Sequence, residues 1–157
     1  MISLREFEPS DIGLIVNWSS RPEALDNTDF SDLIGDESEA YFSQMLSNRN
    51  SMQYIIQLDA DPIGYIGMNR QPDDWWKLQV VIAETHLRGK GFGPEAIKLL
   101  ISKVGYRGIS KVFADVEARD TRTIRAFEKA NFVSMGVEQH FTGGSSPGNK
   151  IRFESFI

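Results

Sequence analysis

Three glycines alternate with larger residues in the run Gly89-Lys90-Gly91-Phe92-Gly93, immediately before a segment with helical periodicity. Alternating glycines let several backbone N–H groups turn toward one anion, and the N-terminus of the following helix adds the positive end of its dipole. Arg88 and Lys90 add two positive side chains. No Gly-Lys-Ser or Gly-Lys-Thr follows, so the run is not a nucleoside-triphosphatase loop. The run predicts a phosphate-binding loop, and the alternative is a tight turn without a ligand.

The segment Gly91-Phe92-Gly93-Pro94-Glu95-Ala96 also satisfies the dinucleotide-binding fingerprint in its final-alanine form. Asp115 follows near the place where that fingerprint has its ribose-binding acid. Against this interpretation, residues 84–88 separate the loop from the preceding strand, and too little chain follows for a second mononucleotide-binding half. A nicotinamide dinucleotide-binding protein therefore stays as an alternative of another class.

Composition excludes several other kinds of chemistry. The 157 residues include no cysteine, which rules out disulfides, thiolate metal sites and a cysteine nucleophile. The chain has two histidines, which argues against a histidine-based metal site, and we expect no metal. The formal net charge of −5 argues against nucleic acid as a partner, because domains that bind the phosphate backbone are usually basic.

Hydrophobic periodicity predicts the elements that must position the glycine loop. Seven strands are expected at residues 2–7, 52–58, 63–68, 75–83, 111–116, 132–141 and 151–157. Helices are expected after an N-cap at Ser10, at residues 37–46, from Pro94 onward and at residues 121–130. Together they predict a single α+β domain over residues 1–157, in which one β–loop–α–β unit interrupts an antiparallel sheet.

The N-terminus and the apolar runs bear on location. Residues 1–7 contain an acid, Glu6, where a signal peptide has basic residues, and no long apolar region follows them. No apolar run approaches the roughly 20 residues that a membrane helix needs. We therefore expect a cytoplasmic protein without a membrane partner, present as a monomer or a homodimer.

Two motifs resemble those of the GCN5-related N-acetyltransferases, the GNAT superfamily. The run from Arg88 to Gly93 is similar to its Arg/Gln-x-x-Gly-x-Gly/Ala loop, which binds the pyrophosphate of acetyl-CoA. Residues 123–132 resemble its second motif, in which a helix ends in Tyr-Glu-Lys-x-Gly-Phe. The resemblance implies the GNAT fold, an α/β/α sandwich around a mixed, mostly antiparallel sheet of about seven strands.

Two branches of the superfamily look nearest. Residues 55–65 and the strand that ends at Asp115 look most like the aminoglycoside 6′-N-acetyltransferases. Residues 85–96 also resemble the branch that acetylates the N-termini of ribosomal proteins.

The resemblance implies acetyl-CoA as cosubstrate and assigns residues to it. Pantetheine amides would bind the backbone of Val81, Ile82 and Ala83. The pyrophosphate would bind the backbone amides of Arg88, Gly89, Lys90, Gly91, Phe92 and Gly93. Asp120 and Phe127 stand where the cofactor motif usually has Asn and Tyr, and Asn131 replaces its Gly. Because Phe127 lacks the hydroxyl that commonly protonates the leaving thiolate, that role is vacant or filled elsewhere.

Acetyl transfer to an amine requires the neutral amine. With a pKa near 10, about one amine molecule in a thousand is neutral at pH 7, so a carboxylate base is useful. Asp115 matches the position of the catalytic Asp of the aminoglycoside branch, and its alternative role is a turn or capping residue. Glu84 follows the cofactor strand, where many relatives carry a base, and its alternative role is a solvated loop acid.

Charge is unevenly divided along the chain. Residues 22–48 carry seven acids and no Lys or Arg, in the segment that closes over the acceptor in this superfamily. Such a run forms either a solvated surface or a negative funnel for a cationic amine. Residues 88–129 hold ten Lys and Arg against five acids, which suits the phosphates of coenzyme A. Trp18, Trp75 and Trp76 could wall the acceptor cleft, and their alternative role is core packing.

We therefore expect an N-acetyltransferase that transfers acetyl from acetyl-CoA to a primary amine without an acyl-enzyme. The expected acceptor is a cationic small molecule resembling an aminoglycoside or a polyamine. The alternative acceptor is a protein N-terminus of the ribosomal-protein type. A non-catalytic acyl-CoA-binding module, suggested by Phe127, is an alternative of another class.

Overall fold

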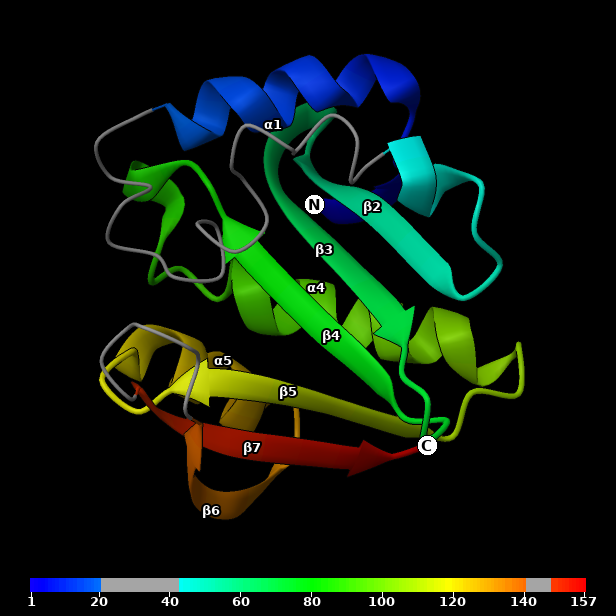
Figure 1. Cartoon of the computed structure of the whole chain (residues 1–157). Coiled ribbons are helices and arrows are strands. Elements are labelled where there is room, and N and C mark those ends of the chain that lie inside the picture. The colour runs from blue at the N-terminus through cyan, green and yellow to red at the C-terminus, as the bar shows by residue number, and fades with distance from the viewer. Residues whose placement is uncertain (21–42, 141–147) are drawn as a thin grey trace.

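The computed structural model describes residues 1–20, 43–140 and 148–157, in which seven strands form one sheet (Figure 1). The strand order is β1-β2-β3-β4-β5-β7-β6. The strands are β1 (Ile2–Glu6), β2 (Ser51–Leu58), β3 (Asp61–Arg70), β4 (Trp76–Ile82), β5 (Lys111–Glu117), β6 (Val133–His140) and β7 (Gly148–Phe156). The helices are α1 (Ile12–Ser19), α4 (Phe92–Gly105) and α5 (Thr121–Lys129), with 3-10 turns η1 (Pro9–Asp11) and η3 (Thr85–Leu87).

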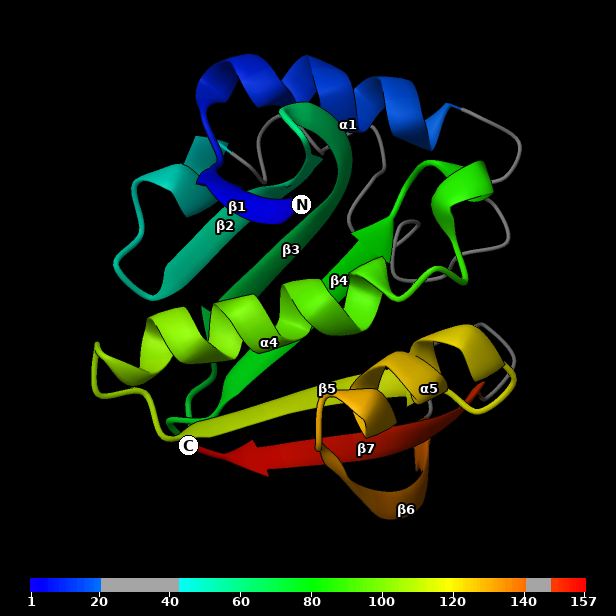
Figure 2. The same cartoon turned by 180° about the vertical axis from the view of Figure 1, so that it is seen from behind.

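Helices cover both faces of the sheet. α4 and α5 lie on one face (Figure 2), and α4 packs on it with the buried residues Ala96, Ile97, Leu100 and Val104. α1 covers the other face, where Ile15 and Trp18 join a second hydrophobic cluster. Alternation along β2 supplies both layers, since Ile55 packs under α1 whereas Ile56 belongs to the larger core. The predicted α/β/α sandwich with a mixed, mostly antiparallel sheet is confirmed.

The seven predicted strands are present, with shifts of a few residues at their ends. The predicted N-cap at Ser10 is wrong, because η1 precedes α1 and includes that residue. Most of the helix predicted at 37–46 lies outside the described residues, and its described end, 43–46, is helical.

β4 and β5 are the only parallel neighbours among the described strands, and they pair over very few residues. Trp76 pairs with Val112 and Lys77 with Phe113, and the ladder ends there. β3 and β4, by contrast, pair along the whole of β4. Beyond Lys77 the two strands diverge (Figure 1), so the carboxyl half of β4 has one edge without a strand beside it.

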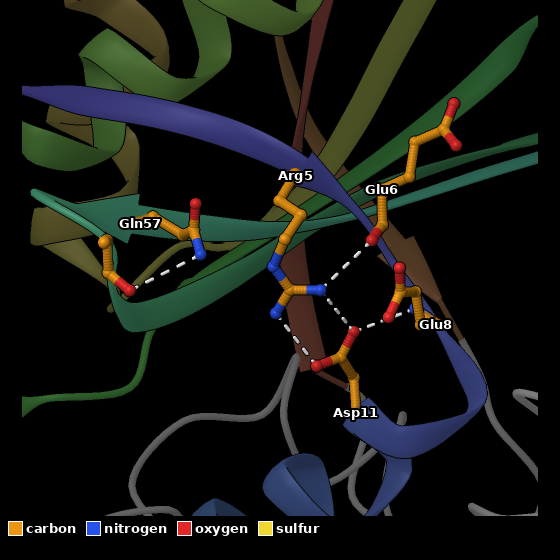
Figure 3. A network of polar contacts seen from close by, with 6 residues as sticks. Arg5, Glu6, Glu8, Asp11 and Gln57 are labelled. Atoms are coloured by element: carbon orange, nitrogen blue, oxygen red, sulfur yellow. Dashed lines mark hydrogen bonds and ion pairs between the residues drawn. The ribbon is translucent and has the colours of Figure 1, made fainter.

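An ion pair connects β1 to the start of α1 (Figure 3). Arg5 donates from Nη1 and Nη2 to the two carboxylate oxygens of Asp11, at 2.8 and 2.9 Å, and the Glu8 N–H donates to Asp11 Oδ2 at 2.8 Å. Burial opposes ionisation of Asp11, but the hydrogen bonds from Arg5 and from the Glu8 amide outweigh it and lower the pKa of this carboxyl group. The pair fixes where α1 begins, and α1 in turn positions Trp18.

Replacing Asp11 with Asn should lower the free energy of unfolding at pH 7 by about 1–3 kcal/mol, because Arg5 loses its partner. The folded-state pKa of Asp11 is lowered, so its stabilisation is present above the unfolded value of about 3.9 and is lost as the pH falls through the folded value. Urea unfolding between pH 7 and pH 3 measures this. The difference between wild type and Asp11→Asn should shrink toward pH 3, and a constant difference would contradict the ion pair. Asp59→Asn is the control, because its pair with the Met1 amino group is exposed and should contribute little.

Candidate active site

A pocket of about 580 Å³ lies against the free edge of β4. Three segments form its wall: the end of β4, the glycine loop with the start of α4, and the exposed side of α5. Its lining consists of residues 80–82, 87–89, 91–94, 120–123, 125, 126 and 129. The parting of two strands thus opens directly toward the predicted phosphate loop.

The backbone of β4 turns alternate residues toward this pocket. The Ala83 N–H donates to the Ile63 carbonyl of β3 at 2.8 Å, and hydrogen-bonded positions alternate along an antiparallel pair. Val81 and Ala83 therefore direct their backbone groups to β3, whereas Val80 and Ile82 direct theirs to the free edge. Arg88 follows this pattern, because its Nε donates to the Ile82 carbonyl at 2.9 Å.

Of the three residues predicted to bind pantetheine through their backbone, only Ile82 has the required direction. The N–H of Ala83 is taken by β3, and Val81 shares its orientation. Val80 has the same direction as Ile82 and lines the pocket, and sequence reasoning missed it. The missing information was the register between β3 and β4, which fixes which residues face the free edge.

Two glycines of the loop have a left-handed backbone. The φ angles of Gly89 and Gly91 are 77° and 85°, and Gly91 immediately precedes the first turn of α4. Residues with a Cβ adopt such angles at a cost. A Cβ at either position would meet no atom within 4 Å, so the requirement for glycine comes from the backbone angle and not from space. The resulting turn brings the N-terminal end of α4 to the pocket wall.

Positive side chains dominate the charge of the described pocket wall. Arg88, Arg122, Arg125 and Lys129 line it with a single acid, Asp120. The three α5 cations belong to the basic segment 88–129 that was predicted to suit the phosphates, and their spacing of three and four residues places them on one helical face. The exposed Lys90, which was predicted to contribute, is not on the wall. This charge favours a ligand with several negative groups, such as phosphates.

Asp120 has a structural task at the start of α5. Its carboxylate accepts hydrogen bonds from the Thr123 N–H at 3.2 Å and from the Thr123 hydroxyl at 2.7 Å. This is the usual role of an N-cap aspartate, which satisfies a backbone donor that the helix leaves free. Asp120 therefore orients the helix end that borders the pocket.

The structure does not bear out the expected cofactor contact of Phe127. The ring is 1% exposed, stacks on Phe153 and meets Phe132 edge to face, and it does not line the pocket. α5 is strongly amphipathic, so its apolar side faces the sheet and its polar side faces the pocket. Phe127 lies on the apolar side and contributes to the core.

The two candidate base residues lie on the two arms of the opening between the strands. Glu84 comes two residues after the end of β4, and its Oε1 accepts a hydrogen bond from the Trp18 indole N–H at 3.3 Å. Asp115 belongs to the diverging half of β5, and it points to the α1 face because Ala114 and Val116 beside it enter the opposite core.

Asp115 has a buried oxygen without a partner. Its Oδ1 is shielded from solvent and receives no hydrogen bond from the described part of the chain. Buried polar atoms are nearly always paired, so this carboxylate oxygen is an exception that leaves room for a further donor.

None of the three tryptophans lines the described pocket. Trp18 is 2% exposed and packs from α1 into the second hydrophobic cluster. Trp75 and Trp76 lie at the amino end of β4, and the seven residues of that strand span about 20 Å to the end that lines the pocket. Trp76 packs on the larger core, and Trp75 contacts the rings of Phe113 and Phe156. The acceptor-binding role of the tryptophans stays a prediction.

A parallel strand pair that parts beside a glycine loop and a cationic helix face is the arrangement that the resemblance to the GNAT superfamily implied. A family model described as an acetyltransferase (GNAT) domain matches residues 2–133, and the chain belongs to this family.

Several proteins that are similar to this chain are themselves named acetyltransferases. Aminoglycoside N(6′)-acetyltransferase type 1 of Klebsiella pneumoniae is 23% identical over 155 residues, which cover 87% of this chain and 76% of that protein. The structure of aminoglycoside acetyltransferase AAC(6′)-Ib with coenzyme A has a TM-score of 0.78 at 20% identity, covering 97% of this chain and 94% of that one. Spermidine N-acetyltransferase of Vibrio cholerae with coenzyme A and spermine has a TM-score of 0.80 at 17% identity, covering 99% and 95%.

The protein is thus an acetyl-CoA-dependent N-acetyltransferase, as its motifs predicted. The dinucleotide-binding alternative is wrong, and the η3 turn between β4 and the loop separates this site from that fingerprint.

Within the described ranges, no helix is long and apolar enough to cross a membrane. The same residues contain no group of three or more His, Asp or Glu side chains arranged to hold a metal ion.

Gly91→Ala should weaken coenzyme A binding at least about tenfold, because the strained loop would turn an N–H away from the phosphates, and hydrogen bonds to charged groups contribute about 1.5–3 kcal/mol. Gly108→Ala is the matched control. Its φ of 78° and its open surroundings are the same, but it lies outside the pocket wall. Both variants should lose about 1–2 kcal/mol of stability. Isothermal titration calorimetry with coenzyme A measures the affinity of each variant, and equal affinities of the two variants would refute the role of the loop.

Proposed function

We propose that this enzyme acetylates a primary amine of a cationic small molecule and that Asp115 is the general base. The observation that carries the proposal is the buried Oδ1 of Asp115 without a donor, on the arm of the cleft formed by β5. An ammonium group carries three donors and no acceptor, so it complements this carboxylate in both charge and hydrogen bonding. The names of similar proteins, which record aminoglycoside and spermidine acetylation, support the same class of acceptor.

The cosubstrate and the acceptor would approach from opposite faces of the sheet. Backbone groups of Val80 and Ile82 would hold the pantetheine amides, and Arg88 would leave the Ile82 carbonyl to make room for them. The glycine loop and the cations of α5 would hold the phosphates. The thioester would then lie where β4 and β5 part, with the acceptor on the α1 face beside Asp115 and Glu84.

Asp115 would take a proton from the bound ammonium group, which is needed because about one amine in a thousand is neutral at pH 7. The amine nitrogen would then bond to the acetyl carbon as the carbon–sulfur bond breaks and would release its second proton to solvent, and the sulfur would leave as a thiolate that takes a proton from solvent. A thiol pKa of about 8.5 makes this departure easy without an acid at Phe127. Glu84, held by Trp18, would add negative charge beside the amine.

Asp115→Asn should lower kcat/KM at neutral pH by about 10²- to 10⁴-fold, the usual contribution of a general base. Glu84→Gln should lower it much less, because we assign Glu84 no proton transfer. Thiol release under steady-state conditions measures both. The affinity for coenzyme A should stay unchanged in both variants, which controls for folding. A larger loss in Glu84→Gln would move the base to that residue.

The acceptor class can be tested with a panel of polyamines, aminoglycosides and peptides with free N-termini, each with acetyl-CoA. We expect thiol release with polycationic small molecules and a KM that rises with ionic strength, because salt screens the attraction between charges. A singly charged alkylamine is the control and should be a poor acceptor. Activity on the peptides alone would favour a protein N-terminus as the acceptor.

A further inference from the structure

Asp115 stands directly opposite an arginine without pairing with it. Arg152 of β7 is its partner in the antiparallel register. Directly opposed residues share a face of the sheet, with Cβ atoms about 4.5–5.5 Å apart, so an acid and an arginine in this position are expected to form an ion pair. Yet Asp115 Oδ1 is buried and has no donor in the described part of the chain. Something must draw the arginine elsewhere.

Glu154 binds this arginine instead. Arg152 Nε donates to Glu154 Oε2 at 2.7 Å, and the two side chains are 21% and 14% exposed. Glu154 follows Arg152 by two residues on β7, so both side chains lie on the same face. It stands opposite Phe113 of β5, the next residue of that face toward the end of the cleft where β4 and β5 still pair. We call this the closed end of the cleft.

Two aromatic rings also favour the position of the Arg152 guanidinium beside Glu154. The Arg152 guanidinium lies 3.9 Å from the centre of the Phe113 ring and 5.1 Å from the centre of the Trp75 ring. Both distances are within the range of attractive cation–π contacts. Glu154, Phe113 and Trp75 together thus hold the guanidinium on the side of Arg152 that is remote from the open arm of β5.

Other charges share this face. Glu117 of β5 accepts a hydrogen bond from Arg119 at 3.0 Å, and Lys111 lies 5.9 Å from the centre of the Trp75 ring. Lys150 of β7 stands opposite Glu117, so Arg152 is the cation that stands directly opposite Asp115.

We propose that Glu154 is a positioning residue that holds Arg152 away from Asp115 and so keeps this carboxylate available to a cationic amine. The inference rests on the proposed function of Asp115. Without the charge of Glu154, the guanidinium would move by one position and pair with Asp115. That pair would compete with the amine for the carboxylate and make the carboxylate a weaker base.

Glu154→Gln should lower kcat/KM for the amine at least about tenfold, mainly by raising its KM, because close charge pairs couple strongly in partly buried sites. Arg152→Gln should keep activity near that of wild type. The double variant should recover to within about threefold of Arg152→Gln, a rescue that a merely structural role of Glu154 would not give. Glu117→Gln removes the same charge from the same face and should have no effect.

A crystal structure of Glu154→Gln gives a second readout that does not depend on activity. The Arg152 guanidinium should lie within hydrogen-bonding distance of Asp115. Unchanged activity of Glu154→Gln, an inactive Arg152→Gln or a double variant without rescue would overturn the proposal, as would a guanidinium that stays on Phe113. Full activity of Asp115→Asn would instead reject the proposed base, and the crystal structure would still decide whether Glu154 controls Arg152.

Discussion

The early end of the ladder between β4 and β5 is the constraint on which the site depends. Each buried backbone N–H and C=O group needs a partner, and a continuous parallel ladder would supply partners for every second residue along this edge of β4. Here the ladder ends at Lys77 and Phe113, so the groups of Val80 and Ile82 face an open edge. Arg88 satisfies the Ile82 carbonyl in the structure. The sheet therefore lacks strand-to-strand hydrogen bonds at this edge, and the backbone groups there form a row that can bind an extended ligand.

The same parting separates two environments of opposite charge. The cations of α5 and the glycine loop line the pocket wall, whereas Glu84 and Asp115 direct their carboxylates toward the α1 face. The net charge of −5 also conceals an uneven distribution along the chain, because it sums the acidic segment 22–48 and the basic segment 88–129. A polyanionic cosubstrate and a cationic acceptor suit the two faces, and the gap between the strands is where they could meet.

Much of this arrangement was predicted from features that depend on residues close together in the sequence. Features that depend on contacts between distant segments were missed. Glycine adopts the left-handed angles of Gly89 and Gly91 at little cost, so the loop was identifiable from residue type without a structure. The direction of Val80 depends on its register with β3, which is set by residues far away in the chain. Phe127 was misjudged for a different reason, because its role was taken from its motif position although the amphipathic pattern of α5 places it on the apolar side. The role of Val80 was decided by its neighbours in space and not in sequence.

Trp75 illustrates how the closed end of the cleft can influence its open end. It precedes the short stretch where β4 and β5 pair, far from the pocket, yet its ring lies beside Phe113 and the Arg152 guanidinium. A side chain that packs there helps to set the position of a charge next to Asp115. Because β7 runs antiparallel to β5 along both ends of the cleft, the two ends share one ladder of side chains. The geometry of the closed end is therefore part of the electrostatics of the open one.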